Sequence, residues 1–461
     1  MVDRGVLERK LDLLKAAEEY KSRFEAGLSP LEELSSKRPV TFISIGGGEL
    51  GDLVVTAAKR QLGGLAGGIR TVVFARYEGC AAQDAADSFE RFDMMDGALL
   101  EQAIRRHVPD PREPHVIYLE IEKVSTSKAF EMGLSEGYRV MSTCYGPLIC
   151  MDRYLTKLMF DYLKVPRVEW AYASSQAEIE AIASKMGVPL IVKPLMTSSG
   201  HGTSIVETPR QLEGVYDYAV RHARGIGNEV ICEKFLPELR VSGTEVMQIV
   251  VRHFNEEGRI VTSMAPPVEH RRPAATYHES WLPSAISENA ARQCQESARK
   301  IAEFIGGLGV YAVEQFVIGD AVYNNEVANR PHDTGMVTRW MLNQDEGALE
   351  LYSTLGLTLA PHDLNLSRTG IYGVAHVILA PDFPGEEEIP VQAWRANEAR
   401  AFIRRRGYSG DIWYFGKPAA YAYRRMGLAV GFHEDLLKAR QVAEDIAHYA
   451  ERCITYGPTA R

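Results

Sequence analysis

Two acidic residues in neighbouring apolar segments could hold a metal ion. Glu314 lies in the segment 313–317 and Glu326 directly follows the segment 321–325, with Gly319 and Asp320 between the two segments. If the Gly-Asp pair forms a tight turn, the segments pair as an antiparallel hairpin and the two carboxylates approach each other. Inward carboxylates on apolar strands are costly unless they are paired or bind a cation. The spacing predicts a Mg²⁺ site that faces nucleotide phosphates, although single acids at strand edges are also common.

A lysine at the end of another apolar segment precedes a loop of small residues. Lys193 ends the segment 188–193, and Ser198, Ser199 and Gly200 follow it. Backbone N–H groups of such a loop can donate to polyphosphate, and the lysine adds a point charge. The Walker pattern G-x-x-x-x-G-K-[ST] is absent. For this segment alone, a structural turn beside an exposed lysine is an equally good interpretation.

Two further groups of charged residues could act on a phosphorylated substrate. Arg330 could stabilise charge on a transferring phosphoryl group, and Asp333 could orient an amine. Lys417, Arg424 and Arg425 concentrate positive charge near one glycine and suit a phosphate monoester. Taken singly, the first group could be a structural Arg-Asp pair in a loop, and the second could be a solvated basic turn.

The spacing of three glycines near the start of the chain matches the dinucleotide-binding fingerprint. Gly46, Gly48 and Gly51 follow a strand-like segment, in the spacing G-x-G-x-x-G. That fingerprint also needs an acid at the end of the second strand, where this chain has Arg76 and Tyr77. The pattern therefore argues against a nicotinamide cofactor and predicts backbone amides at a helix N-terminus that face another ligand.

The elements that must position these residues fall into four units. Leucines at helical spacing predict a helical arm over 1–39, with an apolar face that needs a partner. Strand-like segments at 40–45, 71–74 and 115–119, at the intervals of βαβ units, predict a parallel sheet within an α/β domain over 40–150. A large α+β unit follows over 151–365. A smaller unit over 366–461 closes with a helix, and the residues predicted on its apolar side are Leu436, Leu437, Val442, Ala443 and Ile446.

Composition limits the classes of function. The 461 residues are 46% hydrophobic and 25% charged, which is typical of a globular protein of several packed units. A net charge of −9 argues against broad binding to nucleic acid or to anionic membranes. No apolar run approaches the roughly 20 residues that span a bilayer, and the charged start does not fit a signal peptide. The six cysteines contain no C-x-x-C pair. We therefore expect a cytoplasmic protein without nucleic-acid or membrane partners.

These motifs occur together and in an order that resembles one family. The stretch 326–338, supported by 278–283, 48–51 and 415–418, is similar to the formate-dependent (type 2) phosphoribosylglycinamide formyltransferases of the ATP-grasp superfamily. The resemblance covers about residues 41–455. It implies an architecture of class α/β and α+β: an ATP-grasp fold with an N-terminal parallel-sheet (pre-ATP-grasp) domain and a small C-terminal domain.

The resemblance also implies a role for each matching residue. Those that would meet the phosphates of ATP are Arg153, Lys193, Ser198, Ser199 and Gly200, and those that would hold adenine and ribose are Glu233, Leu236 and Glu245. Mg²⁺ would be bound by Glu314 and Glu326. The amine substrate would lie against Gly48, Glu49, Leu50, Glu120 and Asp333, with its 5′-phosphate held by Lys417, Arg424 and Arg425. Catalysis would involve Lys193, Arg330 and Asp333.

The implied reaction is ATP- and formate-dependent formylation of glycinamide ribonucleotide through formyl phosphate, a step of purine synthesis carried out by a homodimer. The chain departs from the family at Asp84, His201 and Asn329, where we expect histidine, lysine and proline. A related ATP-grasp ligase of specialised metabolism, which acts through an acyl phosphate on another carboxylate or amine, therefore stays an alternative, as does a non-catalytic nucleotide-binding homologue. A 5-(carboxyamino)imidazole ribonucleotide synthetase fits less well, because the loop after the second acid reads His332-Asp-Thr-Gly instead of His-Asn-Ser-Gly.

Overall fold

A four-stranded parallel sheet forms the N-terminal part of the chain. The computed structural model describes residues 4–30, 39–61, 68–121, 123–196, 200–223, 227–273, 276–385 and 388–457. The strand order is β3-β2-β1-β4, with bounds β1 (Val40–Ile45), β2 (Ile69–Ala75), β3 (Ser88–Arg91) and β4 (His115–Leu119). The helices that accompany it are α2 (Glu49–Gln61), α3 (Gly97–His107), α4 (Thr126–Glu136) and α5 (Tyr145–Met151). The predicted parallel sheet is confirmed, because β1 pairs with β2 and β4 in parallel register.

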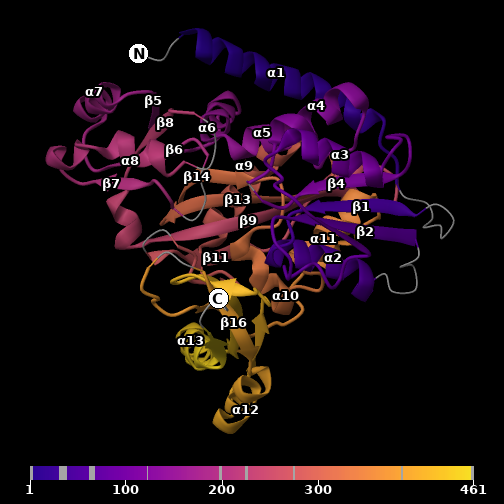
Figure 1. Ribbon diagram of the computed structural model, residues 1–461. Coiled ribbons are helices and arrows are strands. Elements are labelled where there is room, and N and C mark those ends of the chain that lie inside the picture. Colours follow the sequence, from indigo (N-terminus) through magenta and orange to yellow (C-terminus); the bar gives the residue numbers. More distant parts are fainter. Residues whose placement is uncertain are drawn as a thin grey trace.

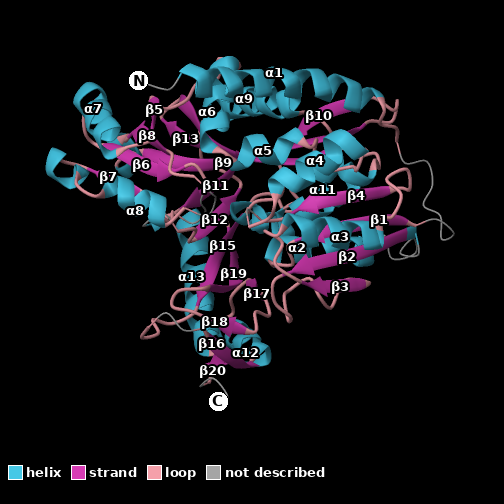
Figure 2. Cartoon of the chain, turned by 45° about the horizontal axis from the view of Figure 1, so that its top comes forward, coloured by secondary structure: helices cyan, strands magenta, loops and turns pink. Residues whose placement is uncertain are grey.

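A small antiparallel sheet forms the second layer, seen at the upper left of Figure 2. Its strand order is β5-β8-β6-β7, with bounds β5 (Trp170–Ala173), β6 (Leu190–Pro194), β7 (Ser204–Val206) and β8 (Val230–Lys234). The associated helices are α6 (Arg153–Tyr162), α7 (Gln176–Met186) and α8 (Val215–Arg221). Lys193 lies one residue before the end of β6, so the predicted position of this lysine at a strand end is confirmed.

A nine-stranded sheet joins the middle of the chain to its C-terminal part. The strand order is β14-β13-β9-β11-β12-β15-β19-β17, with β10 beside β9. The bounds are β9 (Gly243–Phe254), β10 (Ile260–Met264), β11 (Val268–Arg271), β12 (Glu279–Leu282), β13 (Gly309–Ile318), β14 (Ala321–Ala328), β15 (Tyr372–Leu379), β17 (Gly410–Tyr414) and β19 (Arg425–His433), and its helices are α9 (Glu288–Ile305), α10 (Thr338–Met341) and α11 (Glu346–Leu355). Because β12 pairs with β15, the sheet runs across residue 365. The division into four domains stays a prediction.

The remaining C-terminal elements lie at the bottom of Figure 1, where α13 packs against β15 and β19 of this sheet. They are β16 (Ile389–Trp394), α12 (Ala396–Arg406), β18 (Ala419–Ala420), α13 (Leu436–Arg452) and β20 (Ile454–Tyr456). The predicted apolar side of α13 is partly wrong: Ala443 and Ile446 are buried, but Leu437 is 71% exposed. The buried face of α13 continues through Ala439, so Leu437 lies on the solvent side of the helix.

The predicted N-terminal arm is a helix, α1 (Arg4–Ala26), that packs on α6 and α9 (Figures 1 and 2). Leu14 and Ala17 are buried in the largest hydrophobic core, which supplies the partner that the apolar face needed. The carboxylate of Glu25 accepts a hydrogen bond from Gly307 N at 2.7 Å and lies 2.7 Å from Arg252 Nη2. No helix in the described part of the chain is both long and apolar enough to span a bilayer.

Candidate active site

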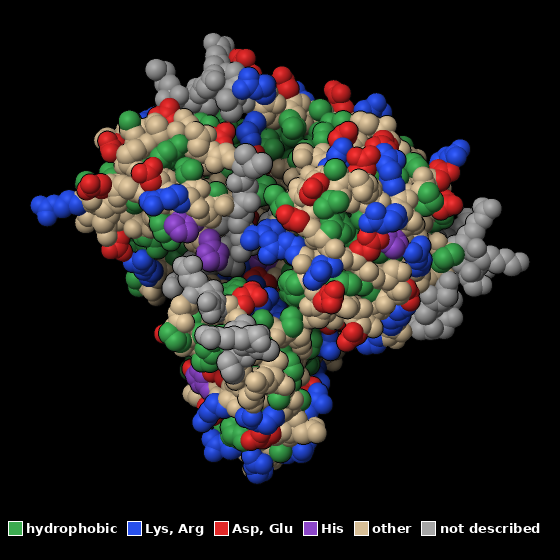
Figure 3. All heavy atoms as spheres, in the orientation of Figure 1, with side chains coloured by type: hydrophobic (Ala, Val, Ile, Leu, Met, Phe, Trp, Pro, Cys, Tyr) green, Lys and Arg blue, Asp and Glu red, His purple; other side chains and the backbone are tan. Residues whose placement is uncertain are grey.

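A cavity of about 1250 Å³ lies between the parallel sheet, the small antiparallel sheet and the strands β13 and β14. The face seen in Figure 3 is hollowed near its centre, where basic and acidic side chains gather. The predicted site residues that line the cavity are Gly48, Glu49, Leu50, Glu120, Arg153, Lys193, Gly200, Glu233, Leu236, Glu245, Glu314, Glu326, Arg330, Asp333, Lys417, Arg424 and Arg425. Ser198 and Ser199 fall outside the described residues. The individual roles of all these residues stay predictions.

The two predicted metal ligands are neighbours across a hairpin. Glu314 on β13 and Glu326 on β14 are paired residues, and a register irregularity follows Glu314. Glu314 pairs closely with Arg272 and lies 3.3 Å from Nε2 of His332, while Oε2 of Glu326 is 3.1 Å from Nη2 of Arg153. Two carboxylates side by side fit Mg²⁺, which usually takes one or two protein carboxylates together with substrate phosphates. In the described part of the chain, no group of three His, Cys, Asp or Glu could hold a metal alone.

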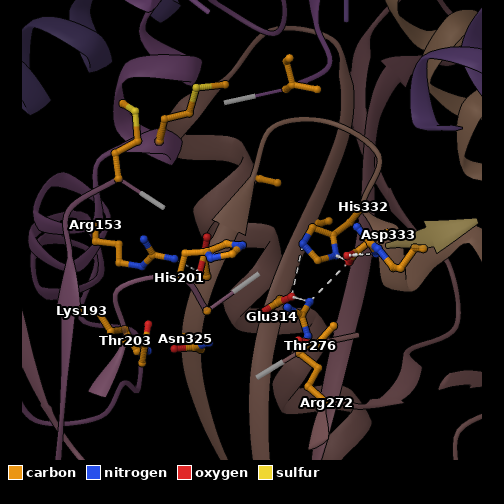
Figure 4. A pocket seen from close by; sticks show the side chains of 18 of the residues that line it. Arg153, Lys193, His201, Thr203, Arg272, Thr276, Glu314, Asn325, His332 and Asp333 are labelled. Carbon is orange, nitrogen blue, oxygen red and sulfur yellow. Dashed lines mark hydrogen bonds and ion pairs between the residues drawn. The ribbon is translucent and has the colours of Figure 1, made fainter. Parts of the chain in front are cut away.

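A buried carboxylate links two lysines at one end of the cavity. Oε1 of Glu233 lies 2.6 Å from Nζ of Lys157 and its Oε2 lies 2.5 Å from Nζ of Lys193. Burial alone would raise the pKa of Glu233, but the two ammonium groups lower it to about 2. The ionised carboxylate therefore fixes Lys193 at the cavity wall, on the same side as Arg153 (Figure 4).

Lys157 was missed by sequence reasoning. It is buried in α6 among Tyr154, Leu158 and other apolar residues, and its Nζ also donates to the carbonyl of Asn325 at 2.7 Å. A lysine on the apolar face of an amphipathic helix is the signal that could have identified it, because such a charge needs a buried partner.

The glycine loop is shaped by the carboxylate of Glu120. Gly46 has a φ of +118°, and a Cβ atom there would lie 2.1 Å from Oε2 of Glu120. A Cβ atom at Gly48 would lie 2.9 Å from Oε1 of the same residue. Glycine is therefore required where Glu120 packs over the turn that leads into α2. The predicted loop before a helix is confirmed, and α2 begins at Glu49.

The opposite end of the cavity gathers three cations. Nζ of Lys417 lies 3.1 Å from Oε2 of Glu49, and Nη2 of Arg425 lies 3.9 Å from Oε1 of Glu49. Arg424 lies beside the ring of Tyr77, with its guanidinium carbon 5.8 Å from the ring centre. Burial lowers the pKa of Lys417, Glu49 opposes that shift, and the two arginines add to it. A dianion is therefore a suitable ligand for this end, because it would relieve the repulsion among the cations.

Asp333 connects this cationic end to the metal hairpin. Its Oδ2 is 2.5 Å from Nη1 of Arg425, and its Oδ1 is 3.5 Å from Nη2 of Arg272 and 3.1 Å from Nδ1 of His332. Burial would raise the pKa of Asp333, but Arg425, His332 and Arg272 together hold it well below its usual range. Arg330 is close by and 9% exposed, and its Nη1 donates to its neighbour Pro331 at 3.1 Å. Asp333 is therefore an anion that can orient an amine but is a poor proton acceptor.

Arg272 and His332 are further site residues that the sequence did not single out. Both line the cavity and both contact Glu314 and Asp333 (Figure 4). Arg272 lies about 40 residues before Glu314 in the chain, so no local pattern could reveal the pair.

Two of the three departures from the family pattern line the cavity. His201 and Asn329 are wall residues, whereas Asp84 is absent from the described lining. Nδ2 of Asn329 donates to the carbonyl of Met141 at 3.2 Å. Glu245, predicted at the adenosine end, lies 3.2 Å from Nε2 of His270.

Comparison with known proteins agrees with this geometry. The model of the ATP-grasp domain matches residues 158–344. A formate-dependent phosphoribosylglycinamide formyltransferase from Syntrophotalea carbinolica is 34% identical over 420 residues, which are 91% of this chain and 97% of the relative.

Solved structures show the same fold. An ADP complex of N5-carboxyaminoimidazole ribonucleotide synthetase aligns with a TM-score of 0.71 at 21% identity, over 91% of this chain and 100% of that structure. The glycinamide transformylase T of Mycobacterium tuberculosis aligns with a TM-score of 0.68 at 23% identity, over 89% and 99% of the two chains. The predicted ATP-grasp fold with its N-terminal parallel sheet is confirmed.

Proposed function

Because the chain belongs to the family of formate-dependent phosphoribosylglycinamide formyltransferases, we propose that it uses Mg-ATP to activate formate and to formylate the amine of glycinamide ribonucleotide. The observation that carries the proposal is that one cavity joins a carboxylate hairpin, a pair of cations beside it and a cluster of three cations at the other end. The hairpin would hold a metal ion bound to polyphosphate, and the pair of cations would neutralise the charge of that polyphosphate. The cluster of three cations would bind a phosphate monoester.

The nucleotide would bind at the end that holds Lys193 and Arg153. The two cations would meet the phosphates, and Glu314 and Glu326 would hold Mg²⁺. When bound, the ion supplies charge neutralisation for phosphoryl transfer. Glu233 keeps Lys193 in place through their 2.5 Å contact.

The amine substrate would bind with its phosphate at Lys417, Arg424 and Arg425 and its amine near Asp333. Arg425 contacts Asp333 directly, so phosphate binding and amine positioning share one side chain. The ionised Asp333 accepts a hydrogen bond from the amine and directs its lone pair toward the acyl carbon.

The chemistry needs two steps, because formate is a poor acyl donor. A formate oxygen attacks the γ-phosphorus, the bond to ADP breaks, and ADP leaves with the bonding electrons. The amine then attacks the carbon of formyl phosphate, the C–O bond to phosphate breaks, and the proton lost by nitrogen leaves with inorganic phosphate. Arg330 lines the same cavity and would stabilise the charge of the transferring group.

The test is ADP release by the purified protein with Mg-ATP and glycinamide ribonucleotide, comparing formate with acetate, bicarbonate, glutamate and no acid. Turnover with formate alone, and the formylated ribonucleotide identified by mass, are expected. ADP release only with another acid would replace formate in the proposal and direct attention to His201 and Asn329 in the cavity wall. No ADP release with any acid would favour a non-catalytic nucleotide-binding protein.

A homodimer in the cytoplasm is also what the family resemblance implies, and sedimentation would test the dimer.

A further inference from the structure

Arg272 lies between the two ends of the cavity. It follows β11 directly, and its guanidinium contacts Glu314 of the hairpin through Nη2. The same Nη2 is 3.5 Å from Oδ1 of Asp333, and Nε is 4.0 Å from Oε2 of Glu245. In Figure 4 the side chain points toward Glu314 and Asp333, away from Arg153 and Lys193. Arg272 thus touches both the proposed metal hairpin and the residue proposed to orient the amine.

The proposed reaction brings three anionic groups into this cavity, and only two have cations assigned to them. The polyphosphate has Arg153 and Lys193, with Arg330 at its transferring group, and the monoester has the three cations at the other end. The carboxylate of the acyl donor must lie between them, because its oxygen attacks the γ-phosphorus and its carbon receives the amine. Arg272 occupies that intermediate position by its contacts.

One N–H group of the Arg272 guanidinium is available to a ligand. Nε of Arg272 is buried and has no hydrogen-bond partner among the described residues, although the side chain as a whole is 18% exposed. A buried N–H without an acceptor costs free energy, which a ligand oxygen would recover. A guanidinium presents its N–H groups as a planar fork that matches the two oxygens of a carboxylate.

We propose that Arg272 binds the carboxylate of the acyl donor, an inference that rests on the proposed function. Its present partner Glu314 is one of the two residues that would bind Mg²⁺. Mg²⁺ held by Glu314 would compensate the charge of this carboxylate, so the guanidinium would then be available to the donor. The carboxylate should therefore bind after Mg-ATP, next to the γ-phosphate, and only weakly to the protein alone.

The experiment compares Arg272→Gln and Arg272→Lys with the control Arg271→Gln. Arg271 is the adjacent residue, its side chain is 55% exposed and it pairs with Glu279, so it is not part of the cavity lining. The separate KM values for carboxylate, ATP and amine are measured by ADP release. Arg272→Gln should raise the KM for the carboxylate about 30-fold and leave the KM for ATP within about 3-fold. Arg272→Lys should raise the KM for the carboxylate less, because it keeps the positive charge. A carboxylate KM that stays unchanged while the KM for ATP or amine rises would overturn the proposal.

A binding measurement separates this inference from the proposed function. Formate is titrated into wild-type and Arg272→Gln protein loaded with Mg²⁺ and a non-hydrolysable ATP analogue, and circular dichroism confirms that the variant is folded. Binding to the loaded wild type that is lost in the variant supports the assignment even if no turnover is found. Equal binding to both proteins, or no binding to the wild type, overturns it. Absence of turnover with any carboxylate would overturn the proposed function instead.

Discussion

Glu314 and Glu326 lie opposite each other on two strands of one hairpin, and each contacts an arginine from another part of the chain. Arg272 contacts Glu314, and Arg153 contacts Glu326. If the two carboxylates hold Mg²⁺ as proposed, both arginines would have to share their carboxylate partner with the ion. This arrangement makes the hairpin the most direct place to test the site.

Replacing Glu326 by alanine should abolish Mg²⁺-dependent ADP release. If Glu326 is one of two carboxylates that hold Mg²⁺, its loss would remove several kcal/mol of charge stabilisation, so we expect kcat to fall by at least about 10³-fold. The fold should persist, because the side chain of Glu326 is 37% exposed and removing it opens no large cavity. The measurement is coupled detection of ADP at several Mg²⁺ concentrations, with a thermal melt for each protein.

The control for this variant is Asp320→Asn at the exposed turn of the same hairpin, where the carboxylate contacts Ser287 and Asn289 instead of the cavity. It should keep wild-type turnover. Normal turnover of Glu326→Ala would remove the metal assignment.

Replacing Lys417 by methionine should weaken binding of the phosphorylated amine and little else. Lys417 is buried at the cationic end, at 3.1 Å from Glu49. Loss of one charge-assisted hydrogen bond should raise the KM for glycinamide ribonucleotide about 10- to 100-fold and leave the KM for ATP within about 3-fold.

The unphosphorylated riboside provides the diagnostic comparison for Lys417. If the lysine binds the phosphate, wild type and variant should process the riboside at equal kcat/KM, and the exposed control Lys438→Met should match wild type with both substrates. A variant that loses activity equally with both substrates would mean that Lys417 acts on something other than the phosphate.

Replacing Glu25 by alanine should destabilise the protein without changing the cavity. The carboxylate accepts a hydrogen bond from Gly307 N and pairs with Arg252, whose side chain is 7% exposed. Leaving a buried guanidinium with one partner fewer should lower the free energy of unfolding by about 2–3 kcal/mol. Urea unfolding checks this, with the exposed Glu19→Ala of the same helix as the control. Equal midpoints for the two variants would show that the contacts of Glu25 with Gly307 and Arg252 contribute little to stability.

Some parts of this site could be predicted from the sequence and others could not. The difference depends on how many residues separate the contacting partners along the chain. Glu314 and Glu326 are joined by a two-residue turn, so strand pattern and turn chemistry were enough to bring them together. Lys157 could have been found from its place on an apolar helix face. Arg272 could not, because only the pairing of β9, β11 and β13 in one sheet brings it to Glu314.

The same limit applies to the fold. Three of the four strands of the N-terminal sheet were predicted because each is a short apolar run at a regular interval, whereas the partly exposed strand β3 was not predicted. The pairing of β12 with β15 joins segments about 95 residues apart. No local sequence pattern therefore indicates that the large sheet continues across residue 365. Leu437 was placed on the buried side of α13 because apolar type alone does not show which side of a helix faces the core at its first turn.

Glu350 gives the protein a predictable dependence of stability on pH. Its Oε2 accepts a hydrogen bond from Val310 N at 2.5 Å, while its Oε1 is buried without a hydrogen-bond partner among the described residues. Burial raises the pKa of Glu350 to about 8, and the hydrogen bond from Val310 only partly opposes this. The folded protein therefore keeps a proton that the unfolded chain loses near pH 4.5.

The sign follows from proton counting. Between pH 4.5 and about 8 the folded state binds more protons at Glu350 than the unfolded state, so the contribution of this residue to stability falls as pH rises through that window. Glu350→Gln keeps an acceptor for Val310 and removes the titration. The variant should gain on the order of 3 kcal/mol over wild type at pH 8.5 and differ little from it at pH 5. Urea unfolding across pH 5–9, with the exposed Glu296→Gln as control, measures the difference. A constant offset between the two curves at every pH would show that Glu350 does not titrate in this range.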